Sequence, residues 1–487
     1  MARPKSSKGE VNHTPITPFE DLGSATQPQN LVWTKLRQMN LTEPNHTEPP
    51  TVTFHGAAQS VSGSMHLLES GPYRFLLDCG LFRGPREEAR HRNSSFPFDP
   101  ASIDAVFLSH AHVDHCGNLP NLFRQGFSGP VYCTPATRDL IAVMLADSAR
   151  AQQNDFGTGL YSREDVDYTI ENCVGVDVDV PFDINDDVQI RFIDAGHILG
   201  SAILLITMLL GGREYRITFS GDLGRRGLPY LCDPSALPAA DLIICESTYG
   251  GKTHDTVAGM STKMADLVHR TVARGGKVLI PAFSLGRTHL VLHYMRLWMA
   301  NRLLPQVPIY VDSPLAQKID VVCQEHGHNI AAVIDEIPCE WIDTAEDAWE
   351  ITTQPEPCII IASGGMCEGG RIVQHLRQHI DDPRSTIVLV SYQAPGSLGS
   401  LLSQRHPTVR FHGKSWNKWI EVADVNGFSG HADKDDFEAL LSGAARDTGR
   451  VRLVHGEPKQ MRALASQLRH LGFADVEAPR HNETVTL

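Results

Sequence analysis

The chain has 487 residues, of which 41% are hydrophobic and 21% charged, a composition typical of a globular protein with enough apolar material for a buried core. No apolar run reaches the roughly 18 residues that a membrane span needs, and no apolar stretch follows the basic start, so we expect neither a membrane protein nor a secretory signal. The ten cysteines form no C-x-x-C pair, which favours reduced thiols in a cytoplasmic protein, and the formal net charge of −14 weighs against nucleic acid as a partner.

Residues 1–50 are polar and rich in Pro, Thr and Asn, and we expect a mostly disordered arm with one short helix at 31–39. The ordered protein is expected to begin at residue 51. From there to about 250, short runs of branched and aromatic residues alternate with Gly, Pro and Asp, a pattern typical of strands. The strands expected in this part are 74–78, 105–109, 189–194, 216–220 and 241–245.

From about 255 to 405 strands alternate with helices, which predicts a parallel sheet flanked by helices. After 429 the first pattern returns, with a strand at 450–455 and a helix at 458–472. We therefore expect an α/β protein in which one β-rich domain, 51–250 and 429–487, is interrupted by an inserted α/β domain, 251–428. The elements expected in the insertion are helices at 260–276 and 285–304 and strands at 277–283, 308–312, 358–363 and 385–392.

The sequence "LSHAHVDHCGNLP", residues 108–120, places three histidines and one aspartate within six positions, directly after an apolar strand. Imidazole nitrogens and carboxylate oxygens are ligands for a divalent ion, zinc above all. His110 and His112 can face one ion from a single extended turn, whereas Asp114 and His115 follow in the next turn and point elsewhere. This spacing favours two adjacent metals over a solvated, His-rich loop.

Two metals need more ligands than this cluster offers. Polar residues at the ends of apolar strands converge on one face of a β fold, and several of the expected strands lead into such a residue. Singly, each is more often a hydrogen-bonded core residue. Together they supply the missing ligands, and the candidates are Asp78, His197, Asp222, Glu246 and His455.

Seven motifs, in order, resemble those of the metallo-β-lactamase fold superfamily and of its β-CASP nuclease branch, which includes RNA-processing exonucleases and endonucleases. "LLDCG" (76–80), "SHAHVDHCG" (109–117), "AGHILGS" (195–201) and "FSGDLG" (219–224) look like the four motifs of the superfamily. "CESTYGG" (245–251), "FSGHAD" (428–433) and "LVHGE" (453–457) look like the additional motifs of the branch. The resemblance covers residue 51 to the end and implies an αββα sandwich with a β-CASP domain inserted as a cap.

The resemblance implies two Zn²⁺ per chain and assigns their ligands by motif. One zinc would be held by His110, His112 and His197, and the other by Asp114, His115 and His455. Asp222 would bridge both ions. Asp78 would hydrogen-bond ligand histidines and fix their orientation.

The activity implied is hydrolysis of single-stranded RNA by a two-metal mechanism, in RNA processing or decay, with 3′-hydroxyl and 5′-phosphate products. His431 would be the general acid, with Glu246 orienting its ring and Asp114 contributing to catalysis through the metal. His455 in the last motif favours RNA over DNA, because DNA-specific members of the branch usually lack that ligand. The resemblance also implies a homodimer. It does not decide between endonuclease and 5′→3′ exonuclease action.

Two stretches of the insertion are candidates for substrate binding. Residues 358–376 read as a strand, a glycine-rich loop and a helix, so that backbone N–H groups near Ser363, Gly364 and Gly365 can cradle a phosphate. An ordinary tight turn is the alternative. Arg287, at the start of another helix, can meet a phosphate or pair with an acidic group.

Two other functions remain open. A small-molecule hydrolase, such as a glyoxalase II-like thioesterase, would explain the histidine cluster but gives no role to the insertion. A non-catalytic RNA-binding subunit is disfavoured because every expected ligand is present. Ser62 stands where the family pattern has threonine, and "FRGPREEARHR" (82–92) can form a basic lip on an acidic protein.

Overall fold

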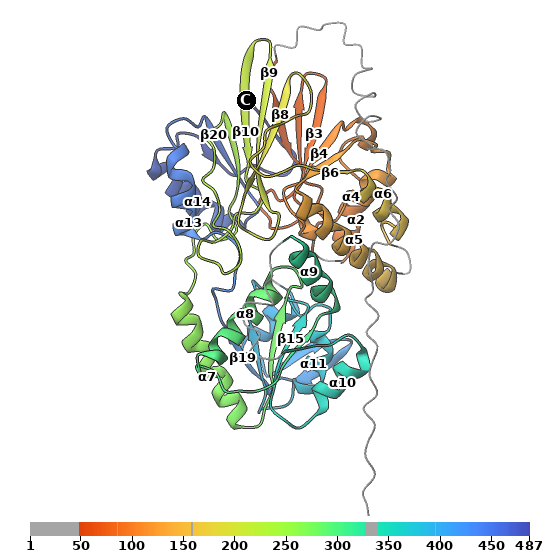
Figure 1. Cartoon of the computed structure of the whole chain (residues 1–487), viewed down its shortest axis with the longest axis vertical. Coiled ribbons are helices and arrows are strands. Elements are labelled where there is room, and N and C mark those ends of the chain that lie inside the picture. Colours follow the sequence, from red (N-terminus) through yellow and green to blue (C-terminus); the bar gives the residue numbers. More distant parts are fainter. Residues whose placement is uncertain (1–47, 85, 157–158, 327–338, 395) are drawn as a thin grey trace, which may run out of the picture. The chain divides into compact units, whose positions relative to one another are not determined.

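The computed structural model describes residues 48–84, 86–156, 159–326, 339–394 and 396–487 (Figure 1). The disordered arm and the short helix expected within 1–50 lie outside the described residues, except for 48–50. The first strand, β1 (Thr51–Phe54), begins where the sequence predicts it. No helix in the described ranges combines the length and the apolar character of a membrane span.

A seven-stranded sheet is built mainly from the first part of the chain, in the order β22-β1-β2-β3-β4-β5-β6. Its last four strands, β3 to β6, run parallel to one another, and β1 pairs with β2 and β22 in antiparallel fashion. The C-terminal strand therefore closes one edge of the N-terminal sheet. The strands not yet bounded are β2 (His66–Ser70), β3 (Tyr73–Leu77), β4 (Ala105–Phe107), β5 (Val131–Cys133), β6 (Cys173–Gly175) and β22 (Glu483–Thr486).

A second seven-stranded sheet has the order β21-β20-β11-β10-β9-β8-β7. Its longest hairpin joins β9 and β10 through Gly211 and Gly212, whose positive φ angles of 54° and 80° suit a two-residue turn. β11 and β20 pair in parallel, with Glu246 opposite Val454, so the intervening chain leaves this sheet and returns to the neighbouring position. The bounds are β7 (Phe182–Asp183), β8 (Val188–Asp194), β9 (Ala202–Leu210), β10 (Arg213–Phe219), β11 (Leu242–Glu246), β20 (Arg450–Val454) and β21 (Val476–Glu477).

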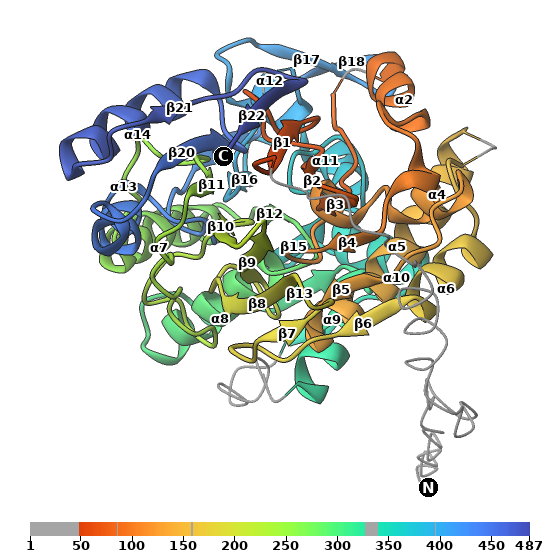
Figure 2. The same cartoon turned by 90° about the horizontal axis from the view of Figure 1, so that it is seen from above.

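The two sheets form the inner layers of an αββα sandwich (Figures 1 and 2). One core cluster joins their facing sides, with Phe75 and Phe107 from the first sheet and Phe192 and Phe219 from the second. A second cluster packs the outer side of the first sheet against α4 (Leu119–Arg124), α5 (Pro135–Phe156) and α6 (Arg163–Glu171). A third packs the outer side of the second sheet against α13 (Lys434–Leu441) and α14 (Pro458–Leu471). The predicted fold class is confirmed.

The third large sheet lies in the inserted region and is wholly parallel, in the order β14-β13-β15-β12-β16-β19. Its central strands, β12 (Val278–Ala282) and β15 (Ile359–Ser363), are apolar except for the final Ser363, as expected of strands whose two faces are both covered by helices. The other strands are β13 (Ile309–Asp312), β14 (Cys339–Trp341), β16 (Thr386–Leu389) and β19 (Glu421–Asp424), and a separate hairpin pairs β17 (Thr408–Phe411) with β18 (Lys414–Asn417).

Helix boundaries in this region differ from the predicted ones for local reasons. The first helix, α7 (Val257–Ala273), begins three residues earlier because the Thr256 side chain caps it by accepting from Gly259 N. The next, α8 (Arg287–Ala300), begins two residues later, after Gly286 with a φ of 76°. The remaining helices are α9 (Pro314–Glu325), α10 (Ala345–Thr353), α11 (Ile372–His379) and α12 (Leu398–Ser403).

Candidate metal centre

The histidine cluster lies in the loop and short helix that follow β4. His110 comes three residues after the end of β4, and His112 is the N-cap of α3 (Val113–Cys116), with extended backbone at φ −66° and ψ 143°. Asp114 and His115 then occupy the single turn of α3. The change from extended to helical backbone directs the two pairs of side chains toward different partners, as their spacing predicts.

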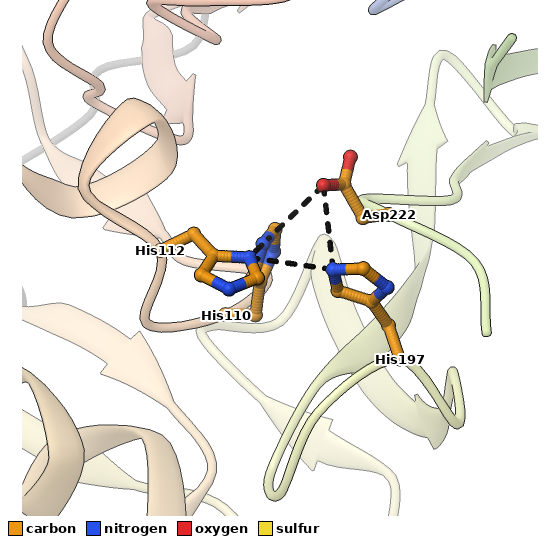
Figure 3. Close-up of side chains that lie close together, drawn as sticks. All are labelled: His110, His112, His197 and Asp222. Atoms are coloured by element: carbon orange, nitrogen blue, oxygen red, sulfur yellow. Dashed lines mark hydrogen bonds and ion pairs between the residues drawn. The ribbon is translucent and has the colours of Figure 1, made fainter. Parts of the chain in front are cut away.

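The first donor group consists of His110, His112, His197 and Asp222 (Figure 3). His112 Nδ1 lies 3.1 Å from His110 Nε2 and 3.3 Å from His197 Nε2. Asp222 Oδ2 lies 3.5 Å from His110 Nε2 and 3.7 Å from His197 Nε2. Three imidazole nitrogens and one carboxylate oxygen thus converge, although the chain supplies them from three separate loops.

The second donor group consists of Asp114, His115 and His455. His455 Nε2 lies 3.4 Å from Asp114 Oδ2, and its Nδ1 lies 3.3 Å from Asp222 Oδ1. His115 Nε2 lies 3.4 Å from the same Asp222 oxygen. Asp222 therefore stands between the two groups and presents one carboxylate oxygen to each.

Asp78 anchors the second group from behind. It is buried directly after β3, with a φ of 60°, and its Oδ2 accepts from His115 Nδ1 at 2.6 Å and from the hydroxyls of Ser64 and Ser109. The backbone N–H of Ser109 donates to Oδ1 at 2.8 Å. Because the carboxylate accepts the Nδ1 proton, the His115 ring is oriented with Nε2 toward Asp222. Asp78 thus contacts His115 directly, and its role in orienting metal ligands stays a prediction.

The pKa values of the buried groups favour metal binding. Burial holds the pKa of His110 and His197 well below the usual range and lowers the pKa of His112 to about 4, so these rings are neutral donors. Burial opposes ionisation of Asp222, but the neighbouring His455 and His115 outweigh it and hold the pKa of Asp222 well below its usual range. Burial opposes charging of His115 and His455, but Asp222 outweighs it and raises the pKa of both rings. Asp222 is thus an ionised carboxylate beside three neutral rings and two protonated ones, and a bound metal would replace the protons of the latter.

Two buried donor atoms that lack a hydrogen-bond partner among the described residues also indicate that the site suits a divalent metal. His115 Nε2 and Asp222 Oδ1 are buried and face each other across 3.4 Å, and neither has a hydrogen-bond partner within the described part of the chain. Unpaired buried donors and acceptors are costly in a folded protein, and metal coordination is one of the interactions that compensates for them. Nitrogen and oxygen donors in this mixture suit zinc.

Beside the first group, Glu246 and His431 form a hydrogen-bonded pair. Glu246 ends β11 and is buried, and its carboxylate accepts from the backbone N–H groups of Leu223 at 2.8 Å and Thr248 at 3.1 Å. His431 Nδ1 lies 3.1 Å from Glu246 Oε1 and 3.9 Å from Asp222 Oδ2. The His431 side chain remains 17% exposed, so its ring is accessible to a substrate at the donor groups.

Arg225 holds the segment that carries His431, a role for which the sequence offers no signal. Its guanidinium donates to the carbonyl oxygens of Gly427 at 2.6 Å and Asp255 at 3.1 Å. Its backbone N–H donates to Gly430 O at 3.0 Å, immediately before His431. Asp255 and Gly427 lie on the two chain segments that connect the sandwich with the third sheet. Both segments are therefore held by Arg225, three positions after Asp222.

The predicted substrate-binding residues lie outside the donor groups. The Ser363 hydroxyl accepts from Arg371 N, and a Cβ on Gly364 would lie 2.0 Å from Gly369 O, so this loop folds tightly on itself. Gly365 packs against Phe283, where a Cβ would lie 2.9 Å from the ring. Arg287 donates to the carbonyl oxygen of Val390 at 2.6 Å. A substrate role for these residues stays a prediction.

Comparisons with known proteins agree with this fold and this site. The Beta-lactamase superfamily domain matches residues 73–280, the Beta-Casp domain 288–402, and the Zn-dependent metallo-hydrolase RNA specificity domain 420–479. The sandwich and its donor groups thus define a metal-dependent hydrolase. The chain belongs to the β-CASP branch of the metallo-β-lactamase superfamily, as the motifs predict.

Curated relatives match nearly the whole chain. Ribonuclease TTHA0252 of Thermus thermophilus is 36% identical over 441 residues, which cover 88% of this chain and 98% of the relative. Transcription termination factor FttA of Methanosarcina mazei is 31% identical over 90% of this chain and 71% of its own length. A crystal structure of a protein of unknown function from Enterococcus faecalis matches with a TM-score of 0.51 at 14% identity. The match covers 90% of this chain and 100% of that one, and it shows that the two proteins share a fold.

Proposed function

We propose that the protein is a ribonuclease that binds two Zn²⁺ and hydrolyses RNA phosphodiester bonds. One zinc would be held by His110, His112 and His197, and the other by Asp114, His115 and His455. The observation that carries this proposal is the position of Asp222, whose two carboxylate oxygens face different donor groups at 3.3 to 3.7 Å. A carboxylate placed in this way can bridge two metals.

Three observations support RNA as the proposed substrate. The C-terminal part of the chain matches a Zn-dependent metallo-hydrolase RNA specificity domain, and the relative that is 36% identical and covered over 98% of its length is named a ribonuclease. His455, the ligand typical of RNA-cleaving members in this motif, lies 3.4 Å from Asp114. The net charge of −14 is compatible with this substrate because bound divalent metals add positive charge at the site.

The metals would supply Lewis acidity, which generates a nucleophile from water at neutral pH and stabilises the charge that develops on the phosphoryl oxygens. The chain's own residues then handle the proton of the leaving group. His431 would donate a proton to the departing 3′-oxygen, and Glu246, whose Oε1 lies 3.1 Å from His431 Nδ1, would stabilise the charged ring. Asp78 keeps His115 oriented throughout, because its Oδ2 accepts the Nδ1 proton at 2.6 Å.

An assay on single-stranded RNA tests this function. Zinc-loaded protein should cleave RNA labelled at the 5′ end or internally, chelator should abolish cleavage, and added zinc should restore it. Fragment sizes from the two labels separate endonuclease from exonuclease action. Hydrolysis of a thioester control in place of RNA would favour the small-molecule hydrolase instead.

Replacing Asp222 tests the metal assignment. Asp222→Ala should lose zinc and cleavage together, with metal content measured by mass spectrometry. RNA cleavage by metal-free Asp222→Ala would contradict the mechanism.

A further inference from the structure

A cavity of about 220 Å³ lies in the sandwich, beside the candidate metal centre. The end of β1, the segment after β3, the helix α2 (Arg86–Ser94) and the residues before β22 enclose it. It is lined by four cationic or titratable side chains and two aromatic rings, which are His55, His91, Arg92, His481, Phe82 and Phe96. These residues come from the N-terminal and C-terminal parts of the sandwich, and the basic stretch 82–92 supplies half of them.

The cavity shares a wall with the metal centre. Gly80 lines the cavity, and a Cβ at this position would lie 1.7 Å from the carbonyl oxygen of Asp114. The backbone of Cys79 donates to His115 O at 2.8 Å. One layer of backbone therefore separates the cavity from the second donor group.

Arg83 stands between the two sites. The Ser62 hydroxyl bonds both backbone groups of Arg83, accepting from its N–H at 3.2 Å and donating to its carbonyl at 3.3 Å. The guanidinium is exposed and within electrostatic range of the Asp114 carboxylate. The backbone of Arg83 is thus held in place, and its charged side chain lies on the side of the second donor group that faces the cavity residue Phe82.

The cavity walls are held in place by buried hydrogen bonds. Asn93 is buried, and its side chain accepts from Phe82 N at 2.8 Å and donates to Phe82 O at 2.9 Å. The Arg92 guanidinium lies 3.7 Å from the centroid of the Phe82 ring. In both views α2 lies next to α4 (Figures 1 and 2). The side chain of Asn121, in α4, donates to the carbonyl oxygen of Asn93, in α2. The basic groups are therefore presented by a rigid frame.

Arg92 gives the cavity a positive charge although the protein as a whole is acidic. Burial lowers the pKa of His55 and of His481, so both rings are neutral hydrogen-bonding groups at neutral pH, and no lining residue carries a carboxylate. Two carboxylates lie nearby. Glu88 is 3.8 Å from Arg92 and offsets part of its charge, but this pair is partly exposed to solvent, and Glu69 is 3.1 Å from Arg74. Such an arrangement suits an anion with an apolar face.

We propose that this cavity binds one nucleotide of the RNA strand, close to the bond that is cleaved. Arg92 and His481 would contact its phosphate, and the base would stack on the ring of Phe96. The volume is smaller than the roughly 300–1,000 Å³ of pockets that enclose a whole small ligand, which fits one unit of a longer chain. The inference rests on the proposed function and names a part of its substrate site.

Binding of a short, fluorescent RNA with phosphorothioate linkages to the zinc-loaded protein tests the cavity. Anisotropy measured between about 50 and 200 mM salt gives both Kd and its salt dependence. Arg92→Gln should raise Kd roughly five- to tenfold and reduce the slope of log Kd against log salt by about 0.7, the value for one phosphate contact on a single strand. His481→Gln, at an exposed side chain, replaces a neutral hydrogen-bonding ring and should raise Kd without changing the slope. Phe96→Leu should raise Kd about tenfold with no change of slope, because stacking releases no counterions.

Two controls separate binding from folding. Arg163→Gln, which removes an exposed arginine of α6 paired with Asp167 at 2.8 Å, should leave Kd and slope at wild-type values. Hydrolysis of bis(4-nitrophenyl) phosphate should be unchanged in every cavity variant, because this small diester reaches the metals but does not extend into the cavity.

The outcomes distinguish the cavity from the proposed function. If wild-type protein binds and cleaves RNA while the cavity variants keep its Kd and slope, the cavity proposal is overturned alone. If the variants lose hydrolysis of the small diester in parallel with RNA binding, Arg92 and His481 are structural and the proposal is overturned. If wild-type protein does not bind RNA, the proposed function and the cavity proposal are both overturned.

Discussion

His431 Nδ1 lies 3.1 Å from Glu246 Oε1, although the two residues are 185 positions apart in the sequence. Glu246 is fixed at the end of β11 by two backbone N–H groups, so its carboxylate cannot turn away from the ring. In this contact the Nδ1–H group of His431 donates to the Glu246 carboxylate. The other ring nitrogen, Nε2, is therefore left for proton exchange.

Replacing Glu246 with glutamine tests this contact. Glu246→Gln keeps the size of the side chain but removes the charge that stabilises a protonated His431. We expect kcat for RNA cleavage to fall about 100-fold, with KM and zinc content close to wild type. Steady-state kinetics and metal analysis measure the three quantities. Glu346→Gln, at an exposed position in the first turn of α10, is the matched control and should change none of them. A wild-type kcat in Glu246→Gln would remove Glu246 from the mechanism.

Arg225 offers a test of how the segment before His431 is positioned. Arg225→Ala removes the hydrogen bonds to Gly427 O and Asp255 O. Since small displacements of a catalytic group are costly, we expect kcat to fall about 10- to 100-fold, and Arg225→Lys to retain part of the activity. Arg226→Ala is the control: it removes the neighbouring arginine, whose exposed side chain pairs at 2.9 Å with Asp436 in the first turn of α13, and should have little effect on kcat. Equal kinetics for the Ala variants at 225 and 226 would contradict the positioning role.

Asp78 is expected to control metal affinity without being a ligand. Asp78→Asn weakens the acceptor for His115 Nδ1–H and for two serine hydroxyls. Loss of such a partner typically lowers metal affinity about 10- to 100-fold. Competition with a chromogenic zinc chelator measures this change, and Asp447→Asn, at an exposed position, serves as the control. Unchanged zinc affinity in Asp78→Asn would show that His115 is oriented by other contacts.

His66 should make the protein sensitive to acid. Its ring is buried between Phe54 and Phe219. Its pKa is lowered to about 3, mainly by burial and to a smaller extent by the nearby His115, His55 and His455. In the unfolded state the pKa of this residue is about 6.5. Between pH 6.5 and 3 the unfolded state therefore binds a proton at His66 that the folded state does not bind. The stability of the folded protein should be complete above pH 6.5 and should decline as the pH falls toward 3.

Replacing His66 with phenylalanine should remove this part of the pH dependence. Urea unfolding in the presence of chelator, at neutral and at mildly acidic pH, should show a smaller loss of stability for His66→Phe than for the parent protein. Chelator keeps the pH dependence of metal binding out of the comparison. An identical pH dependence for both proteins would place the acid sensitivity at other groups.

Much of the site can be predicted because donor residues follow apolar strands. Glu246 ends β11, and His455 follows β20 directly. His110 comes shortly after β4, and Asp222 shortly after β10. The strands are recognisable from short windows of branched residues, and the ends of neighbouring strands meet at one edge of a sheet. Arg287 shows the limit of this approach, because its donation to Val390 O depends on the next strand of the third sheet rather than on its own helix.

The sequence by itself determined the fold class, the family and the residues able to hold metal, because hydrophobic periodicity and motif spacing are local properties. Only the tertiary structure decided that Asp222 presents one oxygen to each donor group, that Arg225 ties down the segment before His431, and that His55, Arg92 and His481 surround one cavity. These relationships join residues from distant segments with no common periodicity. They follow from the order of strands in the two sheets, in which β22 closes against β1 and β20 against β11.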